Sequence, residues 1–229
     1  LVIYANGATV KVGAWGLVNV PVGTDNVSIV LYGGDYQANT DQGSFIKPRG
    51  NGVISIELYD VNYTDASANN WILDSSTYEG ENLSIQVIGG EYTGDAGFIL
   101  GCAAPGNFLL DGVTINTRDH AVDTGGEDTA EPGMAPCITI NNCNITVNAA
   151  AYREDVACIV SAFGSQTVVT NCTLTSNTHI ITMGNGQSNN KIELTGCTIN
   201  HTSDTYEAFH FMKPGTLIVD GAEITMQAQ

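Results

Sequence analysis

An eight-residue pattern that recurs nine times limits the fold of this chain more than any other feature of the sequence. In most copies, apolar residues occupy positions one, three and eight, and position five is Gly, Asn or Asp. Apolar and polar residues alternate on either side of position five, which indicates two short strands joined by a bend. Gly, Asn and Asp best tolerate the left-handed backbone that such a bend requires. The copies begin at Ile3, Ile29, Ile56, Ile85, Phe108, Ile138, Thr167, Ile192 and Leu217.

The spacing of the copies predicts a solenoid. Successive copies end 23 to 30 residues apart, the length of one solenoid coil, and helical periodicity is nearly absent. A second β-rich run lies between copies, as at residues 71–73, 98–100, 157–160, 179–181 and 209–211. One coil cannot bury its apolar face alone, but a stack of coils can. We therefore expect an all-β fold, a single-stranded right-handed parallel β-helix of about nine coils, forming a single domain over residues 1–229.

Equivalent positions of the repeat should form columns along the rod. Position six predicts an inward column of small residues, in which three consecutive cysteines serve as reduced apolar fillers. No two cysteines have CxxC spacing, so the sequence does not indicate a zinc site. The expected column contains Ala8, Gly34, Val61, Gly90, Val113, Cys143, Cys172, Cys197 and Ala222.

Tyrosines fall into two of the expected columns. Position eight stacks Tyr36, Tyr63 and Tyr92 inside the solenoid, where each hydroxyl needs water or a polar partner. Position four places Tyr32 over Tyr59 on the outer face. An exposed tyrosine pair on a flat sheet can stack against sugar rings, and the alternative is simple packing between strands. Tyr32 and Tyr59 are therefore the candidate carbohydrate-binding residues.

The charge balance excludes several classes of partner. Acidic residues outnumber basic ones 24 to 7, a net charge of −17, whereas phosphate binding needs clustered Lys and Arg. Nucleic acid and anionic membranes are thus excluded, and no apolar run approaches the ~20 residues of a membrane helix. The acidic loop at 123–136 could bind calcium weakly, although it lacks EF-hand spacing. No other metal or cofactor is predicted, since the four histidines lack metal-ligand spacing and are interpreted as surface or corner residues.

Neither end of the repeat array carries a visible capping helix. The first copy begins two residues into the chain, and the last ends five residues before Gln229. An uncapped solenoid exposes backbone groups that invite further strand pairing. We expect the chain to be a segment of a larger protein, or its ends to contact further domains or subunits.

The phrases NNCNI, TNCTL and TGCTI, repeated at coil spacing, resemble the pectin-lyase-like superfamily of right-handed parallel β-helices. The resemblance covers essentially the whole chain. It implies the fold and leaves the activity open, because pectate lyases, polygalacturonases, phage tailspikes and bacterial surface adhesins share that architecture.

One stretch is similar to the catalytic motifs of polygalacturonases. The chain carries NTRD at 116–119, ED at 154–155, THI at 178–180 and FMK at 211–213, in the family's order and at coil spacing. The resemblance implies that Asp119 or Asp123 pairs with Asp155 as proton donor and water-activating base, at the wide separation of an inverting enzyme. His179 would tune the acid, and Lys213 would hold a substrate carboxylate.

This sequence departs from the polygalacturonase pattern at each motif. Arg118 interrupts the first motif, both glycines around His179 are missing, and Phe211 stands where the family has Arg. A pectate-lyase-like alternative would use Arg118 or Arg153 as the base beside calcium-binding carboxylates, and corner salt bridges are the other interpretation of these residues.

The leading functional hypothesis is a non-catalytic extracellular β-helix. A regular fold, an acidic exterior and an incomplete catalytic set favour a rigid stalk or a binding surface on a bacterial cell or a phage particle. The expected partner is a polysaccharide or a cell-surface glycan. The alternative is an enzyme that degrades an acidic polysaccharide, either a glycoside hydrolase or a polysaccharide lyase.

Overall fold

The computed structural model describes residues 1–13, 15–38, 43–65, 71–78, 80, 82–101, 106–124, 137–150, 155–162, 164–184 and 190–227. Within these ranges the chain forms β-strands arranged in three parallel sheets, here called A, B and C. Sheet A contains nine strands: β1 (Val2–Tyr4), β4 (Val27–Tyr32), β7 (Ile54–Tyr59), β10 (Leu83–Ile88), β13 (Gly106–Asp111), β16 (Cys137–Asn141), β19 (Gln166–Thr170), β22 (Asn190–Thr195) and β25 (Gly215–Asp220).

Sheets B and C complete each coil. Sheet B contains nine strands: β2 (Thr9–Val12), β5 (Asp35–Ala38), β8 (Asn62–Asp65), β11 (Glu91–Gly94), β14 (Thr114–Thr117), β17 (Asn144–Val147), β20 (Thr173–Ser176), β23 (Thr198–His201) and β26 (Glu223–Met226). Sheet C contains eight: β3 (Val18–Val20), β6 (Ile46–Pro48), β9 (Leu73–Asp74), β12 (Ile99–Leu100), β15 (Val122–Asp123), β18 (Ala157–Ser161), β21 (His179–Met183) and β24 (Phe209–Phe211).

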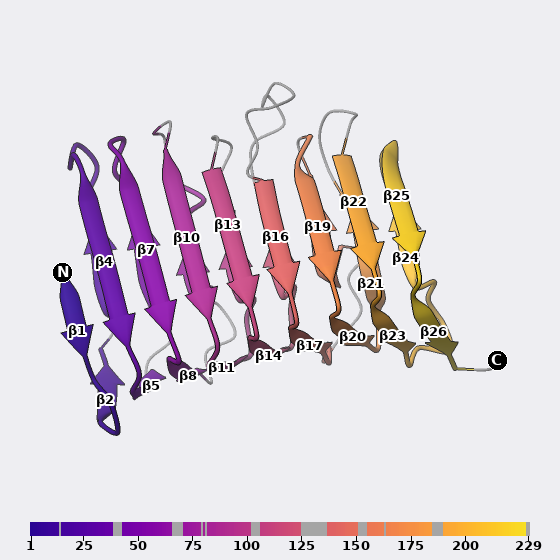
Figure 1. Cartoon of the computed structure of the whole chain (residues 1–229), viewed down its shortest axis with the longest axis horizontal. Helices are drawn as coiled ribbons and strands as arrows, with labels where there is room; N and C mark the ends of the chain where they lie inside the picture. Colours follow the sequence, from indigo (N-terminus) through magenta and orange to yellow (C-terminus); the bar gives the residue numbers. More distant parts are fainter. Residues whose placement is uncertain are drawn as a thin grey trace.

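The order of the strands makes the molecule a parallel β-solenoid. The chain visits sheets A, B and C in rotation, and each strand pairs in parallel with the strand one coil before or after it. The strands of sheet A lie side by side along the long axis, and the two termini lie at opposite ends of the rod (Figure 1). The all-β parallel solenoid is thus confirmed, whereas its right-handed winding stays a prediction.

The bend between sheets A and B adopts the left-handed conformation in every repeat. All nine residues at position five have positive φ, between 51° and 72°. Six of them are Gly, which meets no steric penalty there, and the others are Asp and Asn, which tolerate this region better than other side chains. The predicted bend is therefore confirmed at Gly7, Gly33, Asp60, Gly89, Gly112, Asn142, Asn171, Gly196 and Gly221.

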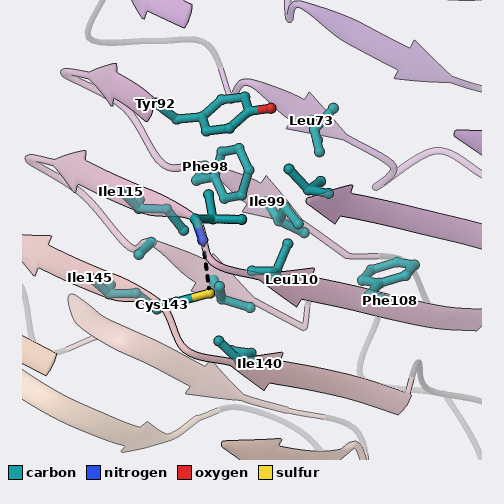
Figure 2. Close-up of a cluster of buried hydrophobic side chains, with 14 of the residues drawn as sticks. Leu73, Tyr92, Phe98, Ile99, Phe108, Leu110, Ile115, Ile140, Cys143 and Ile145 are labelled. Atoms are coloured by element: carbon teal, nitrogen blue, oxygen red, sulfur yellow. Dashed lines mark hydrogen bonds between the residues drawn. The ribbon is translucent and has the colours of Figure 1, made fainter. Parts of the chain in front are cut away.

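Columns of apolar side chains from consecutive coils form the core. Figure 2 shows Ile115 beside Ile145 and Leu110 beside Ile140, pairs that the register also aligns. The predicted inward column of Tyr36, Tyr63 and Tyr92 is confirmed, since the register aligns the three residues and all are buried. Phe45 from the turn before sheet C lies against both Tyr36 and Tyr63. Removing a large buried side chain here would leave a cavity that a rod of hydrogen-bonded coils cannot close.

The three stacked cysteines are buried, free thiols, as the column of small residues predicts. Each thiol also has a hydrogen-bonding role at the bend. The Cys143 thiol donates to the Asn141 carbonyl at 3.1 Å and accepts the Val113 amide at 3.4 Å from the preceding coil (Figure 2). The Cys143 amide in turn donates to Cys172 Sγ at 3.2 Å. Thiols therefore satisfy backbone groups that would otherwise be buried without a partner.

The first repeat differs from its predicted alignment. Ile3 pairs with Leu31 and Tyr4 with Tyr32, so the expected placement of Ile3 over Ile29 is wrong by two residues. The bend of this coil contains residues 5–8, two more than later bends, and Ala5 rather than Ala8 packs against Gly34. Ala8 is consequently exposed, which corrects its predicted inward position.

Most of sheet C follows the second β-rich run of each repeat, and β3 and β15 are additional strands that the sequence pattern does not predict. At the far end of the rod, inward-facing residues lose their cover. Val219 is 40% exposed, although Leu194 in the same column is fully buried. Ala222, predicted to face inward, is only half-buried for the same reason.

Candidate functional site

Three outward-facing tyrosines form a ladder on the outer face of sheet A. The rings of Tyr4 and Tyr32 are stacked with centroids 4.8 Å apart and planes 6° apart, and those of Tyr32 and Tyr59 are 5.1 Å and 10° apart. The predicted pair of Tyr32 over Tyr59 is confirmed, and the shifted register of the first coil adds Tyr4. We call these three residues the tyrosine ladder. Tyr4 is 73% exposed, and the other two are half-buried.

The ladder has a polar side. The Tyr59 hydroxyl donates to Glu57 Oε2 at 2.8 Å, and Ser55 Oγ lies 3.4 Å from Oε1 of the same carboxylate. The hydrogen bond to Glu57, together with burial, raises the pKa of Tyr59. Because the rings cover one another's faces, the ladder presents mainly ring edges and hydroxyls to solvent. Tyr4, at the end of the stack, has one ring face without a tyrosine against it.

A second group lies at the junction of sheets B and C. His120 Nε2 is 3.2 Å from Asp119 Oδ1 and 3.7 Å from Asp155 Oδ2, which comes from the next coil. The imidazole is 3% exposed, the Asp119 side chain 21% and the Asp155 side chain 41%. Asp119 also accepts the backbone amide of His120 at 2.9 Å. We call Asp119, His120 and Asp155 the aspartate–histidine cluster.

Trp71 covers one side of this cluster. Its ring is stacked on that of His120 with centroids 5.6 Å apart and planes 13° apart, although the two residues lie two coils apart. The intervening coil carries Gly97, where an added Cβ would lie 2.1 Å from Trp71 Cζ3. Glycine therefore makes the stacking possible. The result is a partly open aromatic and carboxylate surface, a combination that suits a polar ring-shaped ligand.

The two carboxylates of the cluster flank one imidazole. Inverting glycosidases separate their carboxyl pair by ~6.5–9.5 Å so that a water molecule fits between them. Here Asp119 and Asp155 both approach His120 Nε2, at 3.2 Å and 3.7 Å. Their role as an acid and base pair stays a prediction.

The other predicted catalytic residues that the structure describes lie on several coils. Asp123 belongs to β15 and pairs with Leu100 and Val160 within sheet C. Lys213 is exposed beyond β24. Arg118 lies 3.4 Å from Asp95, an exposed ion pair that fits the interpretation as a corner salt bridge. Arg153, Glu154 and most of the acidic loop, at 125–136, lie outside the described residues.

Three of the four histidines are buried at the ends of strands or between them, so they are corner residues, and their interpretation as surface residues is wrong. His120, His179 and His201 are each at most 3% exposed. His201 Nε2 lies 2.7 Å from the Thr178 carbonyl, and His179 Nδ1 lies 2.7 Å from the Glu207 carbonyl. Burial lowers the pKa of His179, which favours its neutral form. One ring nitrogen of His179 and one of His201 each find a backbone carbonyl on a neighbouring coil, which offsets part of the cost of burying these two rings.

A third group lies at the same junction, on the two coils that follow the coil of Asp155. His179 from one coil meets Glu207 and His210 from the next, and one ligand atom of each lies within 4.8 Å of the others. We call these residues the histidine–glutamate cluster. Sequence spacing did not reveal it because 28 residues separate His179 from Glu207. An alignment of the sheet C strands from coil to coil, like that of the eight-residue repeat, places His179 beside Glu207 and would have indicated the cluster.

No family model, curated protein or solved structure matches this chain. Within the described residues, no helix has the length and hydropathy needed to cross a membrane. The fold is therefore known from its geometry alone, and function has to be inferred from the surface groups described above.

Proposed function

We propose that this chain is a non-catalytic extracellular β-helix that binds glycans on the outer face of sheet A. The proposal includes a right-handed winding and a distant relationship to the pectin-lyase-like superfamily. The observation that carries it is the tyrosine ladder, three nearly parallel rings on the outer face of sheet A. A cell or virion surface is the location that fits such a partner.

The chemistry of the ladder favours a carbohydrate over other partners. Aromatic rings with polar tips bind amphipathic ligands, whose apolar C–H faces and hydroxyl groups they can contact together. Glu57, fixed by Tyr59 and Ser55, adds an acceptor for sugar hydroxyls beside the rings. Because parallel strands hold the ladder, binding requires little ordering of the protein, which preserves affinity. The net charge of −17 favours neutral or cationic glycans over acidic ones.

Replacing the central ring tests the proposal. Tyr32→Ala is expected to lower the affinity for glycans by about tenfold, measured on those glycans that the wild-type protein binds. The reason is that one well-packed aromatic contact contributes ~0.5–1.5 kcal/mol beyond its buried area. Binding is measured by glycan microarray and then by calorimetry with the best soluble oligosaccharide. Tyr32→Phe separates the contribution of the hydroxyl from that of the ring.

The matched control is Val168→Ala. Val168 is 39% exposed on the same face of sheet A, but it lies on β19, far along the rod from the ladder. It should leave binding unchanged. A microarray without any retained glycan, or equal losses in Tyr32→Ala and Val168→Ala, would contradict the proposal.

The aspartate–histidine cluster supports a second candidate function, cleavage of a polysaccharide. The specific observation is an aromatic surface beside two carboxylates that share a buried histidine. If this cluster is catalytic, Asp155→Asn should abolish release of reducing ends or unsaturated products from a panel of polyuronides. Asp95→Asn, which removes the acid of a nearby exposed ion pair, should have no effect. A wild-type protein inactive on the whole panel would rule this function out for these substrates.

A further inference from the structure

The histidine–glutamate cluster brings together three metal-ligating side chains that the proposed function does not use. His179 begins β21, and on the next coil Glu207 precedes the adjacent β24 while His210 lies within it. One ligand atom of each residue lies within 4.8 Å of the others. Two imidazoles and one carboxylate are a ligand set typical of zinc in proteins.

His179 is oriented as a metal-binding histidine is. Its side chain is fully buried, and Nδ1 lies 2.7 Å from the Glu207 carbonyl oxygen. A carbonyl can only accept a hydrogen bond, so Nδ1 carries the proton of the neutral ring and Nε2 carries the lone pair. A second hydrogen bond of this kind fixes the tautomer and the ring orientation of most metal-ligating histidines. Tyr206 packs edge-on against the same ring, with centroids 6.0 Å apart.

Glu207 and His210 form the adjustable side of the cluster. His210 Nδ1 is hydrogen-bonded to Glu207 Oε1, and the His210 ring is stacked on that of His179 with centroids 4.7 Å apart. The side chains of Glu207 and His210 are 55% and 24% exposed. An ion can therefore reach the cluster from solvent, and these two side chains can move toward it while His179 stays fixed.

We propose that His179, Glu207 and His210 bind one divalent transition-metal ion, for which zinc is the best fit. Calcium and magnesium prefer oxygen ligands only, whereas imidazole suits zinc and its neighbours in the first transition row. Ligands around a tetrahedral zinc lie ~3.3 Å apart at Zn–N distances of ~2.0–2.1 Å. The ligand atoms must therefore move slightly closer together on binding. Rotation of the partly exposed His210 and Glu207 side chains allows this movement. A water molecule then completes the coordination.

The bound ion would join two neighbouring coils. His179 and the pair Glu207 and His210 are linked in the backbone by bonds such as Ile180 N–H to Ala208 O at 2.8 Å. A metal across the same junction adds side-chain bonds to this ladder, near the end of the rod where the coils are most exposed. The inference is independent of glycan binding on sheet A, because the two sites lie on different sheets.

Zinc titration of the whole chain, without a histidine tag, tests the inference. A Cys137→Ser background removes a thiol that is exposed in the described part of the chain and could otherwise compete for the ion. We expect one zinc per chain by calorimetry, and a rise in Tm of about 5 °C at saturating zinc, because ligand binding to the folded state alone stabilises it. His210→Ala and Glu207→Gln should each weaken zinc binding by at least about tenfold.

Glu223→Gln is the matched control. Glu223 is an exposed acid of similar type on β26, and its loss should leave zinc affinity unchanged. Because His210 and Glu207 are partly exposed, their variants should keep the wild-type Tm in the absence of zinc. Zinc that binds equally well to wild type, His210→Ala and Glu207→Gln would belong to the acidic surface and would overturn the inference. Failure to observe saturable binding to the wild-type protein would overturn it as well.

Discussion

Gly90→Ala is expected to destabilise the solenoid by about 3–5 kcal/mol, a large part of the ~5–15 kcal/mol that stabilises an ordinary folded domain. Gly90 follows the bend of its coil and has a φ of +85°. A Cβ there would lie 2.1 Å from the carbonyl oxygen of Val61 and 2.9 Å from its carbonyl carbon. Both atoms belong to the backbone of the preceding coil, which can move aside only by disturbing the parallel ladder. Left-handed strain of ~1–3 kcal/mol adds to an overpacking cost of ~1–3 kcal/mol.

Gly112→Ala separates the two contributions. Gly112 has a φ of +67°, but an added Cβ would meet no atom within 4 Å. This variant should therefore lose only the strain of the left-handed conformation, ~1–2 kcal/mol. Gly112→Asn should lose less, since Asn142 and Asn171 hold the same position of the bend in the next two coils.

Urea denaturation followed by circular dichroism measures these losses. The m-value has to be compared among the variants, because a stack of coils can unfold in parts rather than all at once. Equal losses in Gly90→Ala and Gly112→Ala would show that the contact with Val61 does not contribute, and that backbone strain alone explains the effect.

The repeat predicted which side chains stack from coil to coil, because residues at the same repeat position occupy the same place in each coil. The bend at position five and the column from Val113 to Cys197 follow directly from residues that recur at one spacing. The register of the first coil was predicted wrongly. Its bend has two extra residues, which shift Ile3 from Ile29 to Leu31 and leave the apolar pattern intact. A shift of two preserves the alternation of inward and outward faces, so hydrophobicity alone could not reveal it.

The functional clusters were harder to predict than the core. The sequence indicates Asp119 and Asp155 as candidates, but it favours only a surface or corner position for His120, which lies between them. The segments before the sheet C strands vary in length from coil to coil, so their residues have no constant position relative to the repeat. Side-chain stacking such as that of Trp71 on His120 depends on the missing Cβ of Gly97, a relation between three coils that no single segment contains.

A second large effect is expected at a buried ion pair in sheet C. Lys47 and Asp74 form a salt bridge in which the Lys47 side chain is 22% exposed and that of Asp74 is 9% exposed. Ser76 also donates to Asp74, from Oγ at 2.6 Å and from its backbone amide at 3.1 Å. Burial alone would raise the pKa of Asp74, but the hydrogen bonds from Lys47 and Ser76 outweigh it and lower that pKa.

Lys47→Met should cost about 2–4 kcal/mol at pH 7, because it leaves a carboxylate buried without its cation. The cost falls below that of a fully isolated charge since the hydrogen bonds from Ser76 remain. In the double variant Lys47→Met/Asp74→Asn, the charge is gone while an amide oxygen can still accept from Ser76. This variant should recover most of the lost stability.

The pH dependence of the same variants gives a sharper test. In the wild-type protein the folded-state pKa of Asp74 lies below the ordinary ~3.9, so its stabilising contribution is present above pH ~4 and is lost as the pH falls through the folded-state pKa. In Lys47→Met, burial without a cation raises the folded-state pKa, so that variant regains stability as the carboxyl becomes protonated. The difference in unfolding free energy between the two proteins should therefore be largest near pH 7 and should shrink toward pH 3, as measured by urea denaturation at each pH. A difference that stays constant over this range would mean that Lys47 stabilises the coil through its packing and not through the charge of Asp74.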